Sequence, residues 1–380
     1  MKEKLQYIFQ KENLLLLCFL LVPFSFLTTG ILHKGHHIAF MLSGLVIMAS
    51  MIENWWIVAF MGYLVIWQLF IFIYKLFVYE LPFSIVANSF DETIYFMVGV
   101  SIFVALVKSK IKLEVFYNVI CVSTVLQVGI AISQHLGFDP FLYFLNIFFY
   151  AVPLLEGTRM TGTLVNNNFL AAYIAITLPF FFRGKTVFCD QTIFGVKVTR
   201  VPYGWFYFIP LIFYVLYITK TTSAFIPALI GTAVYFSAFS FMSTMVWLMI
   251  CVVGFYYIFI YHPFWGAHYN DRFDMWKEAL GLSFKSLFTT VFGFGPAASW
   301  SRPHPMHSEW IQCMHQFGIV GITLLTGYVV TIYRKNRMLF SAFVIAVINM
   351  AGNSSIHLSP SAFLIIIIAG LIERERINYG

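Results

Sequence analysis

Runs of apolar residues long enough to cross a lipid bilayer recur from one end of this 380-residue chain to the other. A spanning helix needs about 20 mostly apolar residues, because the hydrocarbon core is about 30 Å thick and a helix rises about 1.5 Å per residue. Only 10% of the residues are charged, whereas a soluble domain carries about 25%. The pattern excludes an ordinary soluble domain and predicts a polytopic membrane protein.

We predict about twelve spans from these runs. They cover roughly residues 13–29, 37–53, 55–76, 92–107, 114–136, 168–183, 203–219, 222–240, 243–261, 309–333, 338–352 and 357–372. Spanning segments must be helices or a closed barrel, because backbone groups in lipid find no water to bond. The runs are continuous rather than alternating, which favours helices. The predicted fold class is therefore all-α, with residues 1–380 forming a single membrane domain.

The distribution of Lys and Arg predicts which side of the membrane each loop faces, because cytoplasmic loops carry an excess of both. With the N-terminus in the cytoplasm, 15 of the 23 basic residues fall in inner segments. Both termini are then cytoplasmic, and the net charge of +7 is a topology signal. The basic residues form no clustered patch of the kind that binds nucleic acid, so we expect no nucleic-acid partner.

Two long segments lie on the outer side in this topology, at residues 137–167 and 262–308. The first contains the aromatic run 141–150, which is too short to span and predicts an interfacial helix or a re-entrant segment. The second carries most of the polar side chains that are suited to catalysis, so we expect a periplasmic catalytic loop there.

The first polar cluster precedes the predicted span 168–183. Arg159 is followed by Gly162, which permits a tight turn or a close backbone approach. The run Asn166-Asn-Asn168 is suited to cap the next helix. A helix N-terminus beside an Arg is a natural anion site. The alternative is that the Asn residues only cap the helix and Arg159 only anchors the membrane interface.

The second polar cluster lies in the outer segment 262–308. Residues 271–280 read as a helix, with Arg272 and Trp276 four positions apart on one face. Gly293 and Gly295 indicate a turn. The planar donors of an Arg suit a diphosphate.

Two histidines follow this turn, His304 and His307. His307 lies at the outer start of the span 309–333, where an imidazole can take a proton from a sugar hydroxyl. The alternative is a loop or capping role. Glu309 is expected at the membrane interface, and His315, about two turns further in, is expected to be either functional or hydrogen-bonded to a neighbouring helix.

The sequence predicts neither a metal site nor a disulfide framework. His262, His268, His304 and His307, taken with Asp271 and Asp274, match no compact ligand spacing. No two of the five cysteines lie together in an outer loop. We therefore expect no metal and no cofactor.

Taken in order, these motifs resemble those of the O-antigen ligase and polymerase-like family of bacterial membrane glycosyltransferases. That family typically shows Arg-x-Thr-Gly-Thr and then an Asn-Pro-Asn-like triplet that opens a span ending in Pro. This chain has Arg159-Met-Thr-Gly-Thr163, Asn166-Asn-Asn168 and Pro179. The family then shows an Arg-x-x-x-Trp helix, a Gly-x-Gly turn, and a His that begins a span with Gln and Gly-x-x-Gly. The corresponding residues are Arg272, Trp276, Gly293, Gly295, His307, Gln312, Gly318 and Gly321.

The resemblance covers roughly residues 158–325 and departs from the family pattern at two positions. Asn167 stands where the triplet usually has Pro. The family often has Ser-Arg at the outer start of a following span, whereas this chain has Thr222-Ser-Ala224. Lys220 places a positive charge nearby, although an ammonium does not reproduce the two-pronged contact of an Arg.

The resemblance implies a GT-C-like, metal-independent, inverting glycosyltransferase in the bacterial cytoplasmic (inner) membrane, surrounded by membrane lipids. Its donor would be a glycan on undecaprenyl diphosphate at the outer leaflet, and its acceptor a sugar hydroxyl of a lipid A core or another glycan. His307 would be the general base, and Arg159, Arg272 and Lys220 would bind the diphosphate. Supporting roles would fall to Asn166, Asn168, Trp276, Gly293, Gly295, His304, Glu309 and Gln312.

Three alternative functions remain compatible with the sequence. The same fold serves O-antigen polymerases, which use a second lipid-linked glycan as acceptor, and protein O-oligosaccharyltransferases. A flippase or transporter is a different class, in which internal repeats, broken spans and charged residues at the membrane midplane are common. The candidate polar residues here lie near the outer surface and no repeat is visible, which favours an enzyme.

Overall fold

The computed structural model describes the chain in several stretches separated by gaps. They comprise residues 15–17, 20, 99–139, 160, 162, 167–182, 191–193, 196–198, 205–237, 249, 274–294, 308–332, 335–352 and 360–379.

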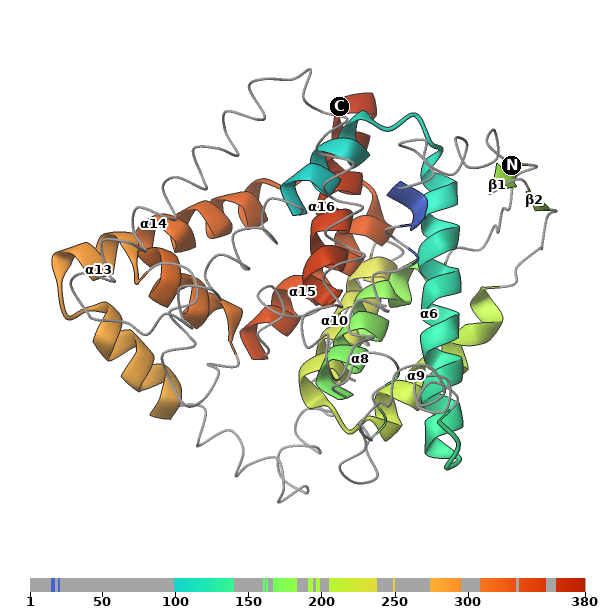
Figure 1. The fold of residues 1–380 in the computed structure, drawn as a ribbon, viewed down its shortest axis with the longest axis horizontal. Coiled ribbons are helices and arrows are strands. Elements are labelled where there is room, and N and C mark those ends of the chain that lie inside the picture. Colours follow the sequence, from blue (N-terminus) through green and yellow to red (C-terminus); the bar gives the residue numbers. More distant parts are fainter. Residues whose placement is uncertain are drawn as a thin grey trace, which may run out of the picture.

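Helices make up nearly all of the described structure (Figure 1). In chain order they are a helix over 99–108, α6 (Leu113–His135), α8 (Asn167–Thr177), η2 (Leu178–Phe182), η3 (Phe206–Phe208), α9 (Ile209–Ile218), α10 (Thr222–Ser237), a helix over 274–283, α13 (Leu287–Phe292), α14 (Glu309–Thr331), α15 (Arg337–Gly352) and α16 (Pro360–Tyr379). A small antiparallel hairpin of β1 (Gln191–Ile193) and β2 (Val196–Val198) accompanies them. The predicted all-α class is confirmed.

The apolar runs located the helices well. Eight of the predicted spans coincide with described helices, and the run 114–136 differs by one residue at each end from α6. The predicted spans 37–53 and 55–76 lie outside the described residues, and 13–29 and 243–261 lie largely outside them.

Within the described ranges, α6 is the single helix that is both long and apolar enough to cross a membrane, judged by length and composition alone. That test is also passed by core helices of soluble proteins. Several other helices are shorter, such as α15, and the polar last turns of α16 lower its hydropathy. The number of spans and the membrane location therefore stay predictions.

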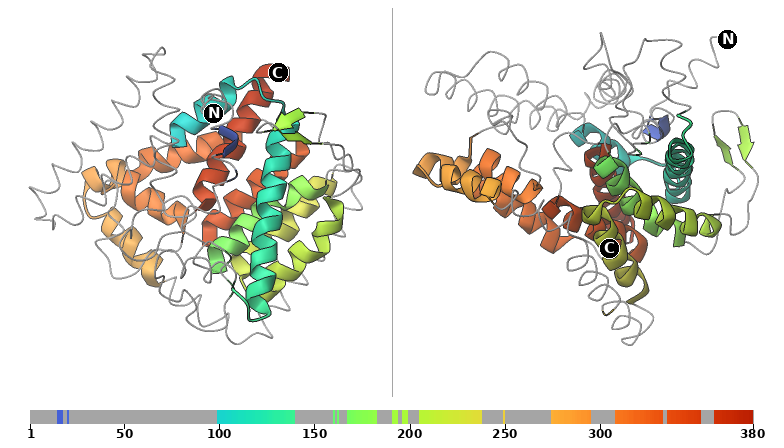
Figure 2. Two further views of the ribbon diagram at one scale, coloured as in Figure 1. Left: turned by 45° about the vertical axis from the view of Figure 1, so that its right-hand side comes forward. Right: turned by 90° about the horizontal axis from the view of Figure 1, so that it is seen from below.

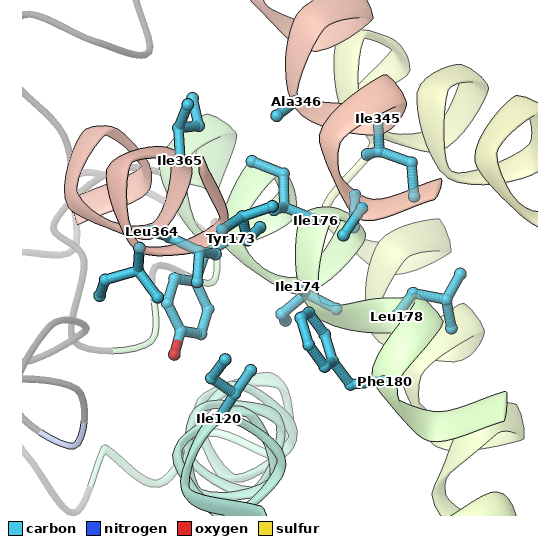
Figure 3. Close-up of a cluster of buried hydrophobic side chains, with 14 of the residues drawn as sticks. Ile120, Tyr173, Ile174, Ile176, Leu178, Phe180, Ile345, Ala346, Leu364 and Ile365 are labelled. Carbon is cyan, nitrogen blue, oxygen red and sulfur yellow. The ribbon is translucent and has the colours of Figure 1, made fainter. Parts of the chain in front are cut away.

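Helix α8 lies at the centre of the bundle. Its side chains from Leu170 to Thr177 are all buried to 1% exposure or less, and it packs against α6, α9, α10, α15 and α16. Three alanines, Ala171, Ala172 and Ala175, let neighbouring helices approach closely. Figure 3 shows side chains from α6, α15 and α16 surrounding this helix, with the Tyr173 hydroxyl directed toward α6. A helix that is apolar on all sides requires protein or lipid around its whole circumference.

The described helices alternate in direction, so that their ends gather at two opposite ends of the bundle. At the lower end in Figure 1, α6 and α9 finish and α8 and α10 begin. At the upper end, α15 begins and α16 finishes: Asn336 Nδ2 donates a hydrogen bond to Glu375 Oε1 at 2.9 Å. Burial raises the pKa of the Glu375 carboxyl, and the hydrogen bond from Asn336 opposes that shift. The predicted topology requires the same grouping, with outward-facing helix ends at the lower end.

Candidate functional site

The start of α8 is tied to the turn that joins α9 to α10. Asn167 Nδ2 donates a hydrogen bond to the Thr219 carbonyl oxygen at 3.2 Å. Thr221 Oγ1 donates to Asn168 Oδ1, also at 3.2 Å. The Asn run is predicted to cap α8, and two of its side chains thus reach across to a neighbouring turn.

Lys220 occupies the middle of this turn with an exposed side chain and a φ of 52°. It is the one residue other than glycine with a positive φ in the described part of the chain. Such a conformation costs an L-residue about 1–2 kcal/mol and persists where the surrounding contacts hold it. Here the bonds to Thr219 and Thr221 hold the turn, and the turn lies beside the electropositive start of α8.

The segment that follows Arg159 is clamped to the last turns of α6. The Gln134 side-chain amide pairs with both backbone groups of Gly162: Nε2 donates to the Gly162 carbonyl at 3.0 Å, and the Gly162 N–H donates to Oε1 at 2.8 Å. Gly162 has a φ of 57°, and a Cβ there would lie 2.8 Å from Leu170 Cδ1 on α8. The turn predicted at Gly162 is therefore observed, and its positive φ and close neighbours favour glycine.

Gln134 is a residue that sequence reasoning missed. The available signal was the pair of amides Gln127 and Gln134, which lie seven residues apart, and hence on one face, in an otherwise apolar run. Intramembrane polar residues are functional candidates by default.

The last turns of α15 connect the start of α10 to the start of α14. Asn349 Nδ2 donates to the Ser223 carbonyl oxygen at 2.7 Å. Trp310 Nε1 donates to the Val347 carbonyl oxygen at 3.5 Å. Positions 347 and 349 are separated by about 3 Å along a helix axis. The Lys220 turn and the start of α14 thus flank the same part of α15, at the lower end in Figure 1.

The first half of α14 carries buried polar side chains. Glu309 is 1% exposed and Gln312 is 2% exposed, and Ser308, His315 and Gln316 are buried as well. The structure buries Glu309 in protein, while its predicted depth at the membrane interface stays a prediction. The start of α14 packs against α15, and α13 contacts α14 further along, near Gln316 and Gly318.

A helical hairpin formed by residues 274–283 and α13 packs against α14. His315 Nδ1 lies 3.0 Å from Ser283 Oγ, so the predicted hydrogen bond of His315 to a neighbouring helix is confirmed. Ser283 Oγ also donates to the Ala279 carbonyl oxygen at 2.9 Å. A hydroxyl has one proton to give, so His315 Nδ1 is the donor in this pair. The stacked rings of Phe294 and His315, 4.6 Å apart, fix the imidazole plane.

Helix α14 is broken at Gly318, where φ is 64° and ψ is −160°. The predicted continuous span 309–333 is therefore wrong at this position. The cause is the close approach of Gly293, the turn residue predicted after α13: a Cβ on Gly318 would lie 2.7 Å from the Gly293 nitrogen. Because neither Gly293 nor Gly318 carries a side chain, their backbones can approach closely.

The helix predicted over residues 271–280 is observed from residue 274, with Trp276 half-buried on it. Arg159, Asn166, Arg272, Gly295, His304 and His307 lie outside the described residues. Four of the predicted site residues, Asn168, Lys220, Glu309 and Gln312, lie near the lower end of the bundle. Among described residues, no group of three His, Cys, Asp or Glu side chains forms a possible metal site.

Comparison with known proteins finds no family model that matches the chain and no matching curated protein.

Proposed function

We propose that this chain is a membrane glycosyltransferase that transfers a glycan from undecaprenyl diphosphate to a sugar hydroxyl, with a lipid A core as the acceptor. The observation that carries the proposal is the meeting of three sequence motifs at one end of the bundle. The Gly162 turn contacts α8, the Lys220 turn is bonded to Asn167 and Asn168, and the start of α14 shares the last turns of α15 with the start of α10.

Membrane embedding is supported by three independent observations. Helix α6 meets the length and composition required to cross a bilayer. The described helices alternate in direction as the predicted topology demands. The excess of Lys and Arg in the inner segments matches the rule for cytoplasmic loops. In that topology the end of the bundle that carries Lys220 faces the outer leaflet.

The proposed reaction is a single displacement. The acceptor hydroxyl oxygen attacks the anomeric carbon, the bond from that carbon to the diphosphate oxygen breaks, and the configuration inverts. His307 accepts the hydroxyl proton as general base. Arg159, Arg272 and Lys220 bind the diphosphate and stabilise the charge that it gains on leaving. Diphosphate is a good leaving group, so this step requires no metal in principle.

The sharpest test uses Lys220, because its charge and its backbone strain can be separated. Asn tolerates a positive φ, so Lys220→Asn keeps the turn and removes the charge. A hydrogen bond to a charged group contributes about 1.5–3 kcal/mol, so we expect the KM for the lipid-linked donor to rise roughly 10- to 100-fold. The matched control is Lys112→Asn, an exposed lysine at the upper end of the bundle.

The measurement is glycan transfer in proteoliposomes that contain the protein, the polyprenyl-diphosphate glycan and lipid A core. His307→Ala should abolish transfer without changing the amount of folded protein. Retained transfer in His307→Ala, or equal kinetics in the two lysine variants, would contradict the assignment. In the native host, a lipid A core that carries one repeat unit in the deletion strain would indicate a polymerase instead.

The break at Gly318 favours one second candidate, a transporter of lipid-linked glycans. Discontinuous helices commonly line the substrate sites of transporters. The same proteoliposomes separate the two functions, since a transporter moves the donor across the bilayer and forms no glycosidic bond.

A further inference from the structure

The hairpin of residues 274–294 contacts the middle of α14, away from the end that the predicted topology places on the outer side. Ser283 and Phe294 contact His315, and Gly293 contacts Gly318. His315 and Gly318 follow the first residue of α14 by about 9 and 13 Å along the helix axis. Helix α13 therefore lies beside the middle of α14 in Figure 1, and the view from below in Figure 2 shows the hairpin at the edge of the molecule.

The polar groups in the turn of this hairpin bond to one another. Thr289 Oγ1 donates to the Ser283 carbonyl oxygen at 3.1 Å, and Thr290 Oγ1 donates to the Ser286 carbonyl oxygen at 2.8 Å. Ser286 and Thr289 also form a capping box at the start of α13. The Phe294 N–H donates to the His315 carbonyl oxygen at 2.8 Å. The polar groups of a turn in water can bond to water, whereas those of a turn in lipid must bond to other protein groups.

The hairpin exposes large apolar side chains between positions 284 and 292, whereas the exposed charged residues Asp274, Lys277 and Glu278 lie in its first turns. Leu287 is 82% exposed, and Phe284, Phe288 and Phe292 are exposed beside it. Beyond Gly318 the exposed residues of α14 include the apolar Ile319, Val320 and Leu324, with Thr323 and Thr326 exposed among them. Because α13 packs against α14, the two sets of exposed apolar side chains lie on neighbouring helices.

We propose that residues 274–294 form a re-entrant hairpin whose exposed apolar side chains contact the acyl chains of outer-leaflet lipids. The proposal rests on the contact with the middle of α14, on the hydrogen bonds within the turn and on the exposed apolar side chains. The inference rests on the proposed membrane position of α14. It moves this part of the predicted outer loop 262–308 out of water. Lys285 is the one charged residue between positions 279 and 294, and its flexible stem lets the ammonium extend toward lipid phosphates.

The test measures the environment of single nitroxide labels in the full-length protein in proteoliposomes. The five natural cysteines are first replaced, and folding is checked by gel filtration. Leu287→Cys and, separately, Phe284→Cys carry the label on the hairpin. Leu126→Cys, an exposed position within α6, is the lipid reference. Leu136→Cys, exposed just after the end of α6 and at the outer limit of the predicted span 114–136, is the reference for the membrane boundary.

The readout is the ratio of collision rates with oxygen and with a water-soluble nickel chelate. We expect ratios at the hairpin labels that match Leu126→Cys and exceed Leu136→Cys several-fold. A hairpin ratio equal to that of Leu136→Cys, with Leu126→Cys still rich in oxygen, overturns the hairpin proposal and leaves membrane embedding intact. Low collision rates with both reagents overturn it in favour of a protein cover. A water-like ratio at Leu126→Cys overturns membrane embedding itself.

Discussion

Replacing Gly293 with alanine should detach the hairpin from α14. Gly293 has a φ of 72° and a ψ of −167°, a region that is essentially restricted to glycine and costs other residues about 1–3 kcal/mol. The added Cβ would lie 2.3 Å from the carbonyl carbon and oxygen of Gln316. These are backbone atoms that cannot rotate away, and overpacking of this kind costs a further 1–3 kcal/mol or so. The expected total is about 2–6 kcal/mol.

The same hairpin contains a matched control. Gly281 lies within the helix 274–283, and a Cβ there meets no atom within 4 Å. Gly281→Ala should therefore stabilise the helix by about 0.5–1 kcal/mol. The two variants carry the same chemical change and differ only in its surroundings.

The assay combines thermal unfolding in detergent with amide hydrogen exchange. Gly293→Ala should lower the unfolding temperature and accelerate exchange in peptides that cover residues 283–294, because the bond from the Phe294 N–H to His315 is lost with the contact. Gly281→Ala should do neither. Unchanged exchange and unfolding in Gly293→Ala would refute the close approach of the two glycine backbones.

Three further predictions follow from individual contacts. Gln134→Leu removes the two hydrogen bonds from the Gln134 amide to the buried Gly162 backbone, which costs about 1–3 kcal/mol. The variant should raise the KM for the donor in the transfer assay more than it lowers kcat. The same change in KM and kcat in a remote variant of equal stability would contradict a positioning role. A double-mutant cycle of Ser283→Ala and His315→Ala should depart from additivity by about 0.5–3 kcal/mol in thermal unfolding; additive losses would argue against the bond. Burial raises the folded-state pKa of Glu375 above 4.5, so the folded state binds the proton more tightly and loses stability as pH rises from there. Glu375→Gln should flatten the fall in unfolding temperature as the pH rises above about 4.5, and an unchanged slope would count against it.

The positions of the helices could be predicted because a spanning segment needs only length and apolar composition. The end of α6 lies within one residue of where its apolar run ends, and the start of α15 lies within one residue of where its apolar run begins. Their alternating directions follow from short connections and from the distribution of basic residues.

The break in α14 could not be predicted, because it depends on a contact between residues far apart in sequence. Gly318 looks like an ordinary helical glycine until Gly293 is brought against it by the hairpin. The burial of Glu309 likewise depends on tertiary packing, since the start of α14 packs against the last turns of α15, which lie far from it along the chain. The site residues whose roles came from the family resemblance stay predictions.

The central position of α8 has a consequence for how the chain is assembled. Of the helices around it, α9, α10, α15 and α16 are synthesised later, and α6 earlier. In the proposed membrane topology, α8 faces lipid during insertion on sides that later contact protein, which is tolerable because it carries no charged side chain. Its final surroundings are complete only when α16 arrives. A nascent chain arrested before Arg337 would display an open central helix to chaperones and quality-control proteases.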